Sequence, residues 1–244
     1  MSDAKTISYP GRRDPLPAPG SAKIYTIGTY TPTFANSGFE VSEAENDRLV
    51  SPKFEGVEPG YLPWTTASGI EAFHVGRRVD FKYFPKRVLK SNSERVHVDI
   101  EEGLGRLKMV SPAFKACVES LQPGAHQFEP FEMVWDDGTT IGTRYFFVPC
   151  RALDTVDEGA STVRRVETYS EYYKTDMRGY WGKVEGPDGK KRRHFIYDLN
   201  AVDGETIWVD EYIVNTIFCS DAFIQAYVDA GLVGMVWNVC ETST

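Results

Sequence analysis

The segment 107–138 constrains the fold more than any other part of this 244-residue chain, because its pieces imply one another. It opens with a short apolar run, 107–110, which predicts a strand. Ser111 then occupies an N-cap position, and Pro112 takes the first helical position, where a missing N–H costs nothing. The apolar residues that follow at helical spacing are Ala113, Phe114, Cys117, Val118 and Leu121.

The second half of this segment predicts the end of the helix and a further strand. Pro123 and Gly124 stop the helix. Residues 126–135 then carry apolar side chains at mostly alternating positions, which is typical of a strand, and a turn comes next at 136–138. The whole segment therefore predicts a strand, a capped helix, a second strand and a turn.

A second segment near the C-terminus has the same pattern. Residues 217–219 lead into Ser220 as an N-cap, with Asp221 as an acid in the first helical turn. Gly231 suits the position just after the helix, and 233–239 predicts a strand. The apolar stripe between them consists of Ala222, Phe223, Ala226, Tyr227 and Ala230.

Aligning the two segments places Ser111 over Ser220 and Phe114 over Phe223. Duplication of one unit explains these matches, and so does independent use of the same capping chemistry. Both explanations stay open at the level of sequence.

The remaining chain predicts short strands and turns. We expect an α+β protein, antiparallel and strand-rich, with a few short helices packed on the sheet. The turn 186–189 predicts a hairpin between 180–184 and 194–199, and Trp208 is expected to be buried. Further elements are expected as strands at 23–29, 95–100, 143–148 and 206–210, a hairpin at 70–83, a helix at 41–50 and a loop at 51–69.

Three regions are expected along the chain. Residues 1–20 are rich in proline and predict a flexible arm. Residues 21–106 form a variable strand-rich part, and 107–244 form an α+β part. The length is that of one good-sized core, so 21–244 is expected to be one compact unit.

Charge argues against a general nucleic-acid binder. The chain has 27 Lys and Arg against 35 Asp and Glu, a net charge of −8, whereas such a binder needs a basic face. This negative charge would suit binding to a basic protein, but it is equally expected of an acidic protein that has no such partner. The basic run 190–193 is interpreted as a solvated hairpin tip. Neither a signal peptide nor an apolar run long enough to span a membrane is found, so we expect no membrane partner and a cytoplasmic location.

The sequence lacks the common catalytic motifs, and the protein is not expected to be an enzyme. Cys117 with His126 is the pair to consider as nucleophile and base, but a stripe cysteine is more often buried and inert. His126 is expected to brace the turn after the first helix. His97 and Asp99 are expected to form a surface pair, which is too few ligands for a metal site. No cofactor or metal is expected, and Cys117, Cys150, Cys219 and Cys240 are interpreted as buried free thiols.

Three stretches together resemble one known family: "ESLQPGAHQFEPFEM…DGT…YFFV", "IWVDEY" and "CSDAFIQAYVDAGLVGMVW". The family is the eleventh of the polymorphic-toxin immunity proteins, formerly domain of unknown function 1629. The resemblance covers roughly 107–237 and implies a bacterial cytoplasmic protein that binds and neutralises a secreted toxin of its own strain. It implies no catalytic residue and no cofactor.

Candidate residues come from this resemblance and from surface chemistry. Acidic side chains would steer a basic toxin, and aromatic side chains would anchor it. A solvated helix face and aromatic core packing are the plainer interpretations. The toxin-binding candidates are Glu40, Glu43, Glu45, Asp47, Asp154, Asp157, Glu158, Tyr172, Tyr173 and Trp181. The residues given structural roles are Ser111, Pro112, Pro123, Gly124, His126, Trp208, Ser220 and Gly231.

Two other function classes stay open. One is an enzyme of unrecognised type that reverses a toxin's modification, and the other is a scaffold protein without a toxin partner. The partner implied is a toxin domain, bound by occlusion of its active site, and a homodimer is open as well.

Overall fold

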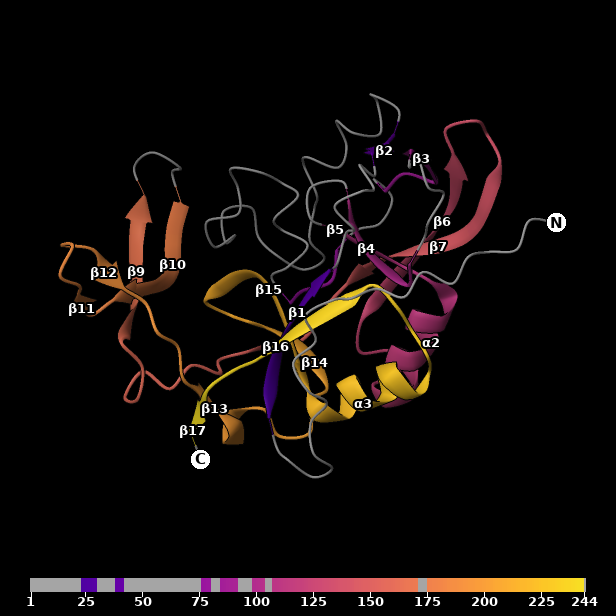
Figure 1. Ribbon diagram of the computed structural model, residues 1–244. Coiled ribbons are helices and arrows are strands. Elements are labelled where there is room, and N and C mark those ends of the chain that lie inside the picture. The colour runs from indigo at the N-terminus through magenta and orange to yellow at the C-terminus, as the bar shows by residue number, and fades with distance from the viewer. Residues whose placement is uncertain are drawn as a thin grey trace.

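The computed structural model describes residues 23–29, 38–41, 76–79, 84–91, 98–103, 107–170 and 175–243. Two sheets form the body of the molecule, and two helices lie side by side against them (Figure 1). The helices are α2 (Pro112–Leu121) and α3 (Asp221–Asp229), and a short 3₁₀ helix, η3, spans Leu199–Ala201. None of the helices among these residues is both long enough and apolar enough to cross a membrane.

The first sheet has five strands and the second has six. In spatial order the five-stranded sheet contains β16 (Met235–Val239), β1 (Ile24–Thr29), β15 (Ile213–Ser220), β14 (Ile207–Asp210) and β8 (Ala152–Leu153). The six-stranded sheet contains β2 (Gly38–Glu40), β3 (Arg87–Ser91), β6 (Gln127–Trp135), β7 (Thr140–Val148), β5 (Leu107–Val110) and β4 (Ile100–Gly103).

Both helices connect strands in the same topological way. Helix α2 joins β5 to β6, which lie on either side of β7 and are antiparallel to it. Helix α3 joins β15 to β16, which lie on either side of β1 and are antiparallel to it. Each unit is therefore a split β-α-β arrangement, with one foreign strand between two parallel ones. The likeness of the two segments thus extends from capping residues to topology.

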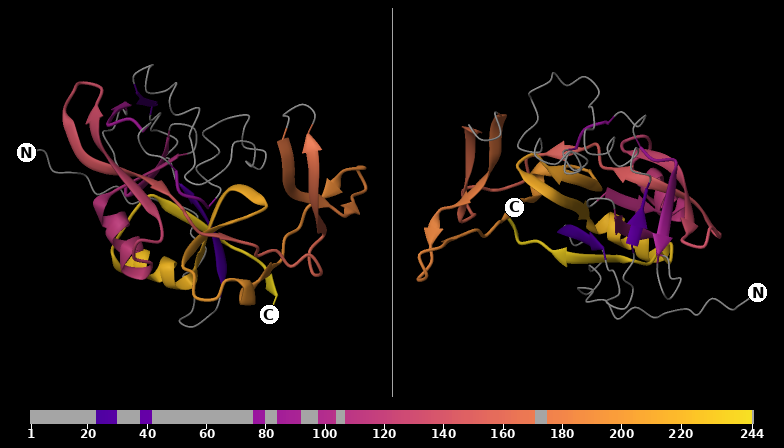
Figure 2. Two further views of the ribbon diagram at one scale, coloured as in Figure 1. Left: turned by 180° about the vertical axis from the view of Figure 1, so that it is seen from behind. Right: turned by 90° about the horizontal axis from the view of Figure 1, so that it is seen from above.

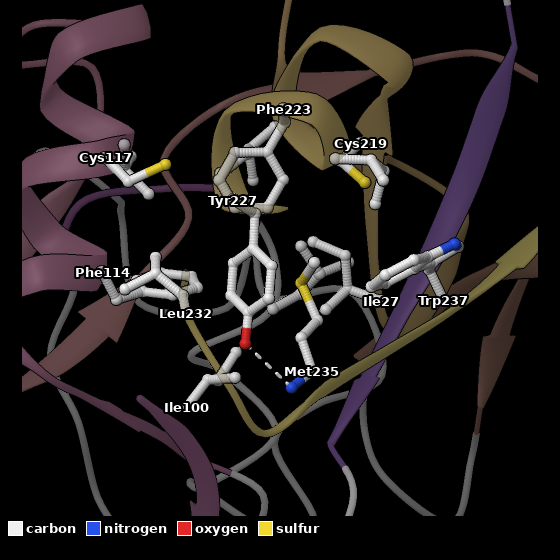
Figure 3. Close-up of a cluster of buried hydrophobic side chains, with 14 of the residues drawn as sticks. Ile27, Ile100, Phe114, Cys117, Cys219, Phe223, Tyr227, Leu232, Met235 and Trp237 are labelled. Atoms are coloured by element: carbon white, nitrogen blue, oxygen red, sulfur yellow. Dashed lines mark hydrogen bonds between the residues drawn. The ribbon is translucent and has the colours of Figure 1, made fainter. Parts of the chain in front are cut away.

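The helices and both sheets share one apolar core. Phe114 of α2 contacts Phe223 and Tyr227 of α3, with ring centroids 5.9 and 6.2 Å apart. Tyr227 also accepts a hydrogen bond from the backbone N–H of Met235, at 3.1 Å, so its hydroxyl is satisfied inside the core (Figure 3). Side chains from β1, β4, β5, β7, β14, β15 and β16 also belong to this core.

Several strands are buried on both faces, which explains their unbroken apolar runs. In β14, Ile207 and Val209 face the helices, while the fully buried Trp208 faces a separate core on the other side. In β7, Phe147 faces the helices and Phe146 belongs to a third core. Alternation of side chains across a strand produces this division.

The antiparallel expectation is correct only in part. The pairs β3–β6, β8–β14 and β13–β17 are parallel, so the sheets are mixed. Here β13 spans Tyr197–Asp198 and β17 spans Thr242–Ser243. Parallel pairing needs a long connection between the strands, and all three pairs have one. An alternating pattern marks a strand without indicating the direction of its neighbour.

Several predicted elements are confirmed, with small shifts at their ends. The strands expected at 23–29, 143–148 and 206–210 correspond to β1, β7 and β14. The strand expected at 95–100 is wrong in its described part, because β4 begins at Ile100. The turn 186–189 connects β11 (Val184–Glu185) to β12 (Lys191–Arg192) instead of reaching 194–199. The predicted arm 1–20, helix 41–50 and loop 51–69 lie outside the described residues, as does most of the hairpin at 70–83.

A smaller unit is packed at its base on the five-stranded sheet and projects from it. Its strands β9 (Val163–Ser170) and β10 (Thr175–Gly182) form an antiparallel hairpin, followed by β11 and β12. We call residues 163–193 the extension. It projects to one side of the body in all three views (Figures 1 and 2).

Candidate interaction surface

Ser111 links the first helix to two distant segments. Its Oγ accepts a hydrogen bond from the backbone N–H of Phe114, at 3.0 Å, and donates one to Oδ1 of Asp99, at 2.6 Å. The other carboxylate oxygen of Asp99 accepts from the backbone N–H of Val233, at 2.8 Å. Asp99 therefore ties the start of α2 to the loop before β16. His97, its expected partner, lies outside the described residues.

The second helix start lacks the matching bond. Ser220 is the N-cap of α3, but its Oγ caps no backbone N–H and is buried without a partner among the described residues. The predicted N-cap position of Ser220 is confirmed, but its side chain does not cap the helix by a hydrogen bond. Asp221 supplies a negative charge to the first turn instead. At the other end Gly231, with φ +66°, adopts the left-handed conformation that closes the helix.

The apolar stripes predicted for the two helices include exposed residues, one in the α2 stripe and two in the α3 stripe. Ala113, Ala222 and Ala230 are exposed, whereas Ile224 is buried in addition to Phe223 and Tyr227. A small alanine at the edge of a stripe fits either side of the boundary, so spacing alone does not place it.

Helix α2 ends at Leu121, and the turn through Pro123 and Gly124 leads into β6. Gly124 has φ +65°, which a residue with a side chain rarely adopts. Its N–H donates to Glu119, at 3.0 Å, and its carbonyl accepts from Arg78, at 2.9 Å.

His126 has both ring nitrogens engaged just after this turn. Nδ1 accepts from the backbone N–H of Cys150, at 3.1 Å, so the proton is on Nε2, which donates to Oε1 of Gln122, at 3.1 Å. The side chain is buried, and burial, with Arg151 and Arg78 nearby, lowers the pKa of His126 to about 4. Burial also raises the pKa of the Cys117 thiol. The two ring nitrogens of His126 bond Gln122 and Cys150 instead of Cys117, and this arrangement suits bracing better than proton transfer.

Gln122 is the centre of this brace, and the sequence did not single it out. Its Oε1 also accepts from Thr206 Oγ1, at 2.6 Å, and from the backbone N–H of Ile207, at 2.9 Å. Its side-chain amide donates to Glu205. One side chain thus connects the end of α2, the start of β6 and the start of β14. Its only sequence signal is its place in the turn LQPGAH.

A buried charge cluster in the six-stranded sheet was also missed. Lys90 of β3, Glu101 of β4 and Arg144 of β7 are almost fully buried and form an ion-paired group. Arg144 also donates to the backbone carbonyl of Val98. Burial lowers the pKa of Lys90, and Glu101 opposes that effect. The apolar-face position of Lys90, two residues after Val88, was the available signal.

Of the acidic candidates near the extension, three are engaged inside the molecule. Arg165 pairs with Asp154, at 2.5 Å, and with Glu158, at 3.5 Å. Asp157 accepts from the backbone N–H groups of residues 159 and 160 and from Ser243. These hydrogen bonds lower the pKa of Asp157, and the largest effect comes from the backbone N–H of Ala160.

Glu40 lies exposed on β2, at the edge of the six-stranded sheet. The remaining candidates Glu43, Glu45, Asp47, Tyr172 and Tyr173 lie outside the described residues. Among the acidic candidates that the structure describes, Asp154 and Glu158 thus meet at Arg165, whereas Glu40 lies on the edge strand β2.

Trp181 differs from these candidates, because its side chain is largely in solvent. It is 55% exposed on β10, and Val184 of β11 is 51% exposed on the same extension. Its neighbour Tyr180 points the other way and is buried against Phe195 and Tyr212, at centroid distances of 5.6 and 5.8 Å. Tyr180 is thus part of the aromatic core packing, whereas Trp181 is exposed to solvent.

The four cysteines are free thiols, of which Cys117 and Cys219 are buried and Cys150 and Cys240 are partly buried. Within the described ranges, no three His, Cys, Asp or Glu side chains are grouped closely enough to hold a metal ion.

Comparison with known proteins identifies the family. The sequence model described as "Immunity protein family (Imm11)" matches residues 31–242, which extends the resemblance seen at 107–237 to most of the chain. No curated protein matches the chain. The protein therefore belongs to the immunity protein family Imm11.

Proposed function

We propose that this protein binds a cognate secreted bacterial toxin one-to-one and neutralises it by covering its active site or substrate groove. Family membership over residues 31–242 carries this proposal. The local chemistry agrees with this proposal, because His126 and Cys117, which were considered as base and nucleophile, are better suited to structural roles. His126 uses both ring nitrogens in hydrogen bonds, and burial raises the pKa of Cys117.

The proposed site of action is the bacterial cytoplasm, where the toxin would otherwise attack the producing cell. Free thiols at all four cysteines are compatible with a reducing compartment. Tight binding would depend on a few buried anchors, whereas charge would mainly accelerate association.

Co-expression tests this proposal. The protein is produced together with the C-terminal domain of the toxin gene next to its own, and growth and complex formation are measured. We expect restored growth and a stable one-to-one complex in size-exclusion chromatography. Full protection without a complex would point to an enzyme that reverses the toxin's modification, and neither protection nor complex would point to a scaffold role.

A further inference from the structure

We infer that the exposed face of the extension, centred on Trp181 and Arg164, is the toxin-docking surface. We further infer that it fits an acidic protein surface with an apolar pocket. This inference rests on the proposed function and adds to it the place of contact and the chemistry of the partner's surface.

Trp181 and Arg164 lie together on that face. They are directly opposite each other in the β9–β10 ladder, and both are exposed. Residues opposite each other in an antiparallel pair project from the same face. The next pair, Tyr180 and Arg165, projects from the other face and contacts Tyr212 of the body. At its base the hairpin thus has one face packed on the body and one face presented to solvent.

The packed face holds the extension in position. Arg165 lies 4.0 Å above the Tyr212 ring and pairs with Asp154 and Glu158. Val163 and Tyr180 are buried in the same core as Trp208. A surface that is rigid before binding loses less entropy when it docks, and this favours affinity.

The extension is basic in an otherwise acidic chain. Residues 163–193 contain nine Lys and Arg against five Asp and Glu, a net charge of +4, so the rest of the chain carries −12. The four residues 190–193 are exposed. Gly182 lets the backbone of Arg192 lie directly against β10, because a Cβ at Gly182 would collide with it. The basic residues of β12 are therefore fixed beside the strand that carries Trp181.

These basic side chains have few acidic partners of their own. Among the described residues, no carboxylate pairs with Arg164, Lys191, Arg192 or Arg193, and Lys183 donates to the backbone carbonyl of Glu158. In the body, several cations are ion-paired, among them Lys86, Lys90, Lys108 and Arg144. The positive charge of Arg164 and of residues 191–193 is thus available to a partner.

This combination favours a protein as the partner. Trp and Arg are the residues most enriched at interface hot spots, and such hot spots have an apolar centre inside a polar rim. The exposed Trp181 and Val184 supply apolar area, and the basic residues supply the rim. A nucleic acid also attracts basic residues, but the net charge of −8 opposes general binding to it.

The test uses the full chain and the purified toxin domain encoded next to its gene, with binding rates measured by surface plasmon resonance. Trp181→Ala and Arg164→Glu are the informative variants. Leu89→Ala, an exposed apolar residue on β3, and Lys23→Glu, an exposed lysine before β1, are the matched controls. Thermal unfolding checks that all four variants fold. As a second readout, a photocrosslinking amino acid replaces Trp181 or, as its control, Leu89.

We expect Trp181→Ala to weaken binding by about thirtyfold, mainly through faster dissociation. Arg164→Glu should weaken it about tenfold, mainly through slower association and with a flatter salt dependence. The controls should stay within about twofold of the wild type. The crosslinker at position 181 should capture the toxin, whereas that at position 89 should not.

Other results would overturn the inference in distinguishable ways. Wild-type affinity in both informative variants, with the wild type still protecting cells, would leave the proposed function intact and place the docking surface elsewhere. Tighter binding by Arg164→Glu would mean that the partner surface is basic. Binding of duplex DNA that Lys191→Glu/Arg193→Glu abolishes, with toxin binding unchanged, would make the extension a nucleic-acid site. Failure of the wild type to bind or protect would instead overturn the proposed function.

Discussion

Phe114 of α2 and Phe223 of α3 occupy equivalent places in the two β-α-β units and meet edge to face, with ring centroids 5.9 Å apart. Each is the first buried residue of its helix and lies three positions after its N-cap serine. The two units thus join through corresponding residues. Duplication of one unit explains this correspondence, and so does independent use of one capping pattern.

Replacing either phenylalanine by alanine should destabilise the protein strongly. Phe114→Ala and Phe223→Ala should each lower the free energy of unfolding by about 3–5 kcal/mol, because each leaves a cavity in the core shared by both sheets. In the double variant, the loss of unfolding free energy should be about 1 kcal/mol smaller than the sum of the two single losses. This difference is the interaction energy of the two rings. Urea unfolding measures all three, and strict additivity would contradict a direct contact.

The two N-cap serines form a matched pair with different expected outcomes. Ser111→Ala should cost about 1–2 kcal/mol of stability, because it removes the bond to Phe114 and leaves Asp99 without its hydroxyl donor. Ser220→Ala should cost less than about 0.5 kcal/mol, because that hydroxyl makes no hydrogen bond with the described residues. Chemical denaturation of both variants checks this, and equal losses would contradict it.

His126 should make stability depend on pH. Its pKa is about 4 in the folded protein against 6.5 for an unperturbed histidine, so the unfolded chain binds more protons between these values. The contribution of neutral His126 to the free energy of unfolding is therefore complete above pH ~6.5. It is lost as the pH falls towards ~4, which lowers that free energy by on the order of 3 kcal/mol. The measurement is urea unfolding at several pH values.

The control for this pH dependence is His126→Gln, which cannot titrate. It should be less stable than the wild type at neutral pH, and the difference between the two should shrink as the pH falls. Comparison with this variant cancels the opposite tendency of Asp210, whose pKa is raised by burial. A difference that is constant from neutral to acidic pH would contradict the buried, neutral state of His126.

The buried charge cluster gives a fourth prediction. Glu101→Gln should lower the free energy of unfolding by about 3–5 kcal/mol, because Lys90 and Arg144 would then be buried without their shared carboxylate. Glu129→Gln is the control, since its partner Lys86 is mostly exposed, and it should cost less than about 1 kcal/mol. Similar losses in thermal unfolding would contradict the importance of burial.

The sequence predicted local elements well and long-range relationships poorly. Capping residues, helical spacing and the turn at 136–138 are local signals, and they located α2, α3, β6 and β7 correctly. The parallel pairing of β3 with β6 depends on strands that are distant in sequence, so no local pattern reports it.

For polar residues too, local roles could be predicted from the sequence and long-range roles could not. Ser111 was recognisable from its place before a proline and a helical stripe. The tasks of Asp99, Gln122 and Glu101 depend on partners far away in the chain, such as Val233, Ile207 and Arg144. Asp154 and Glu158 lie outside the strands and their partner Arg165 lies on β9, so no local pattern reports these ion pairs.

The most direct test of one-to-one inhibition is a titration of toxin activity. A fixed amount of the toxin domain, well above the dissociation constant, is mixed with increasing amounts of this protein, and residual activity is measured. Stoichiometric occlusion predicts a linear fall that ends at a molar ratio of about one. Complete loss of activity, or complete repair of the damaged target, at a small fraction of that ratio would contradict the account and indicate catalysis.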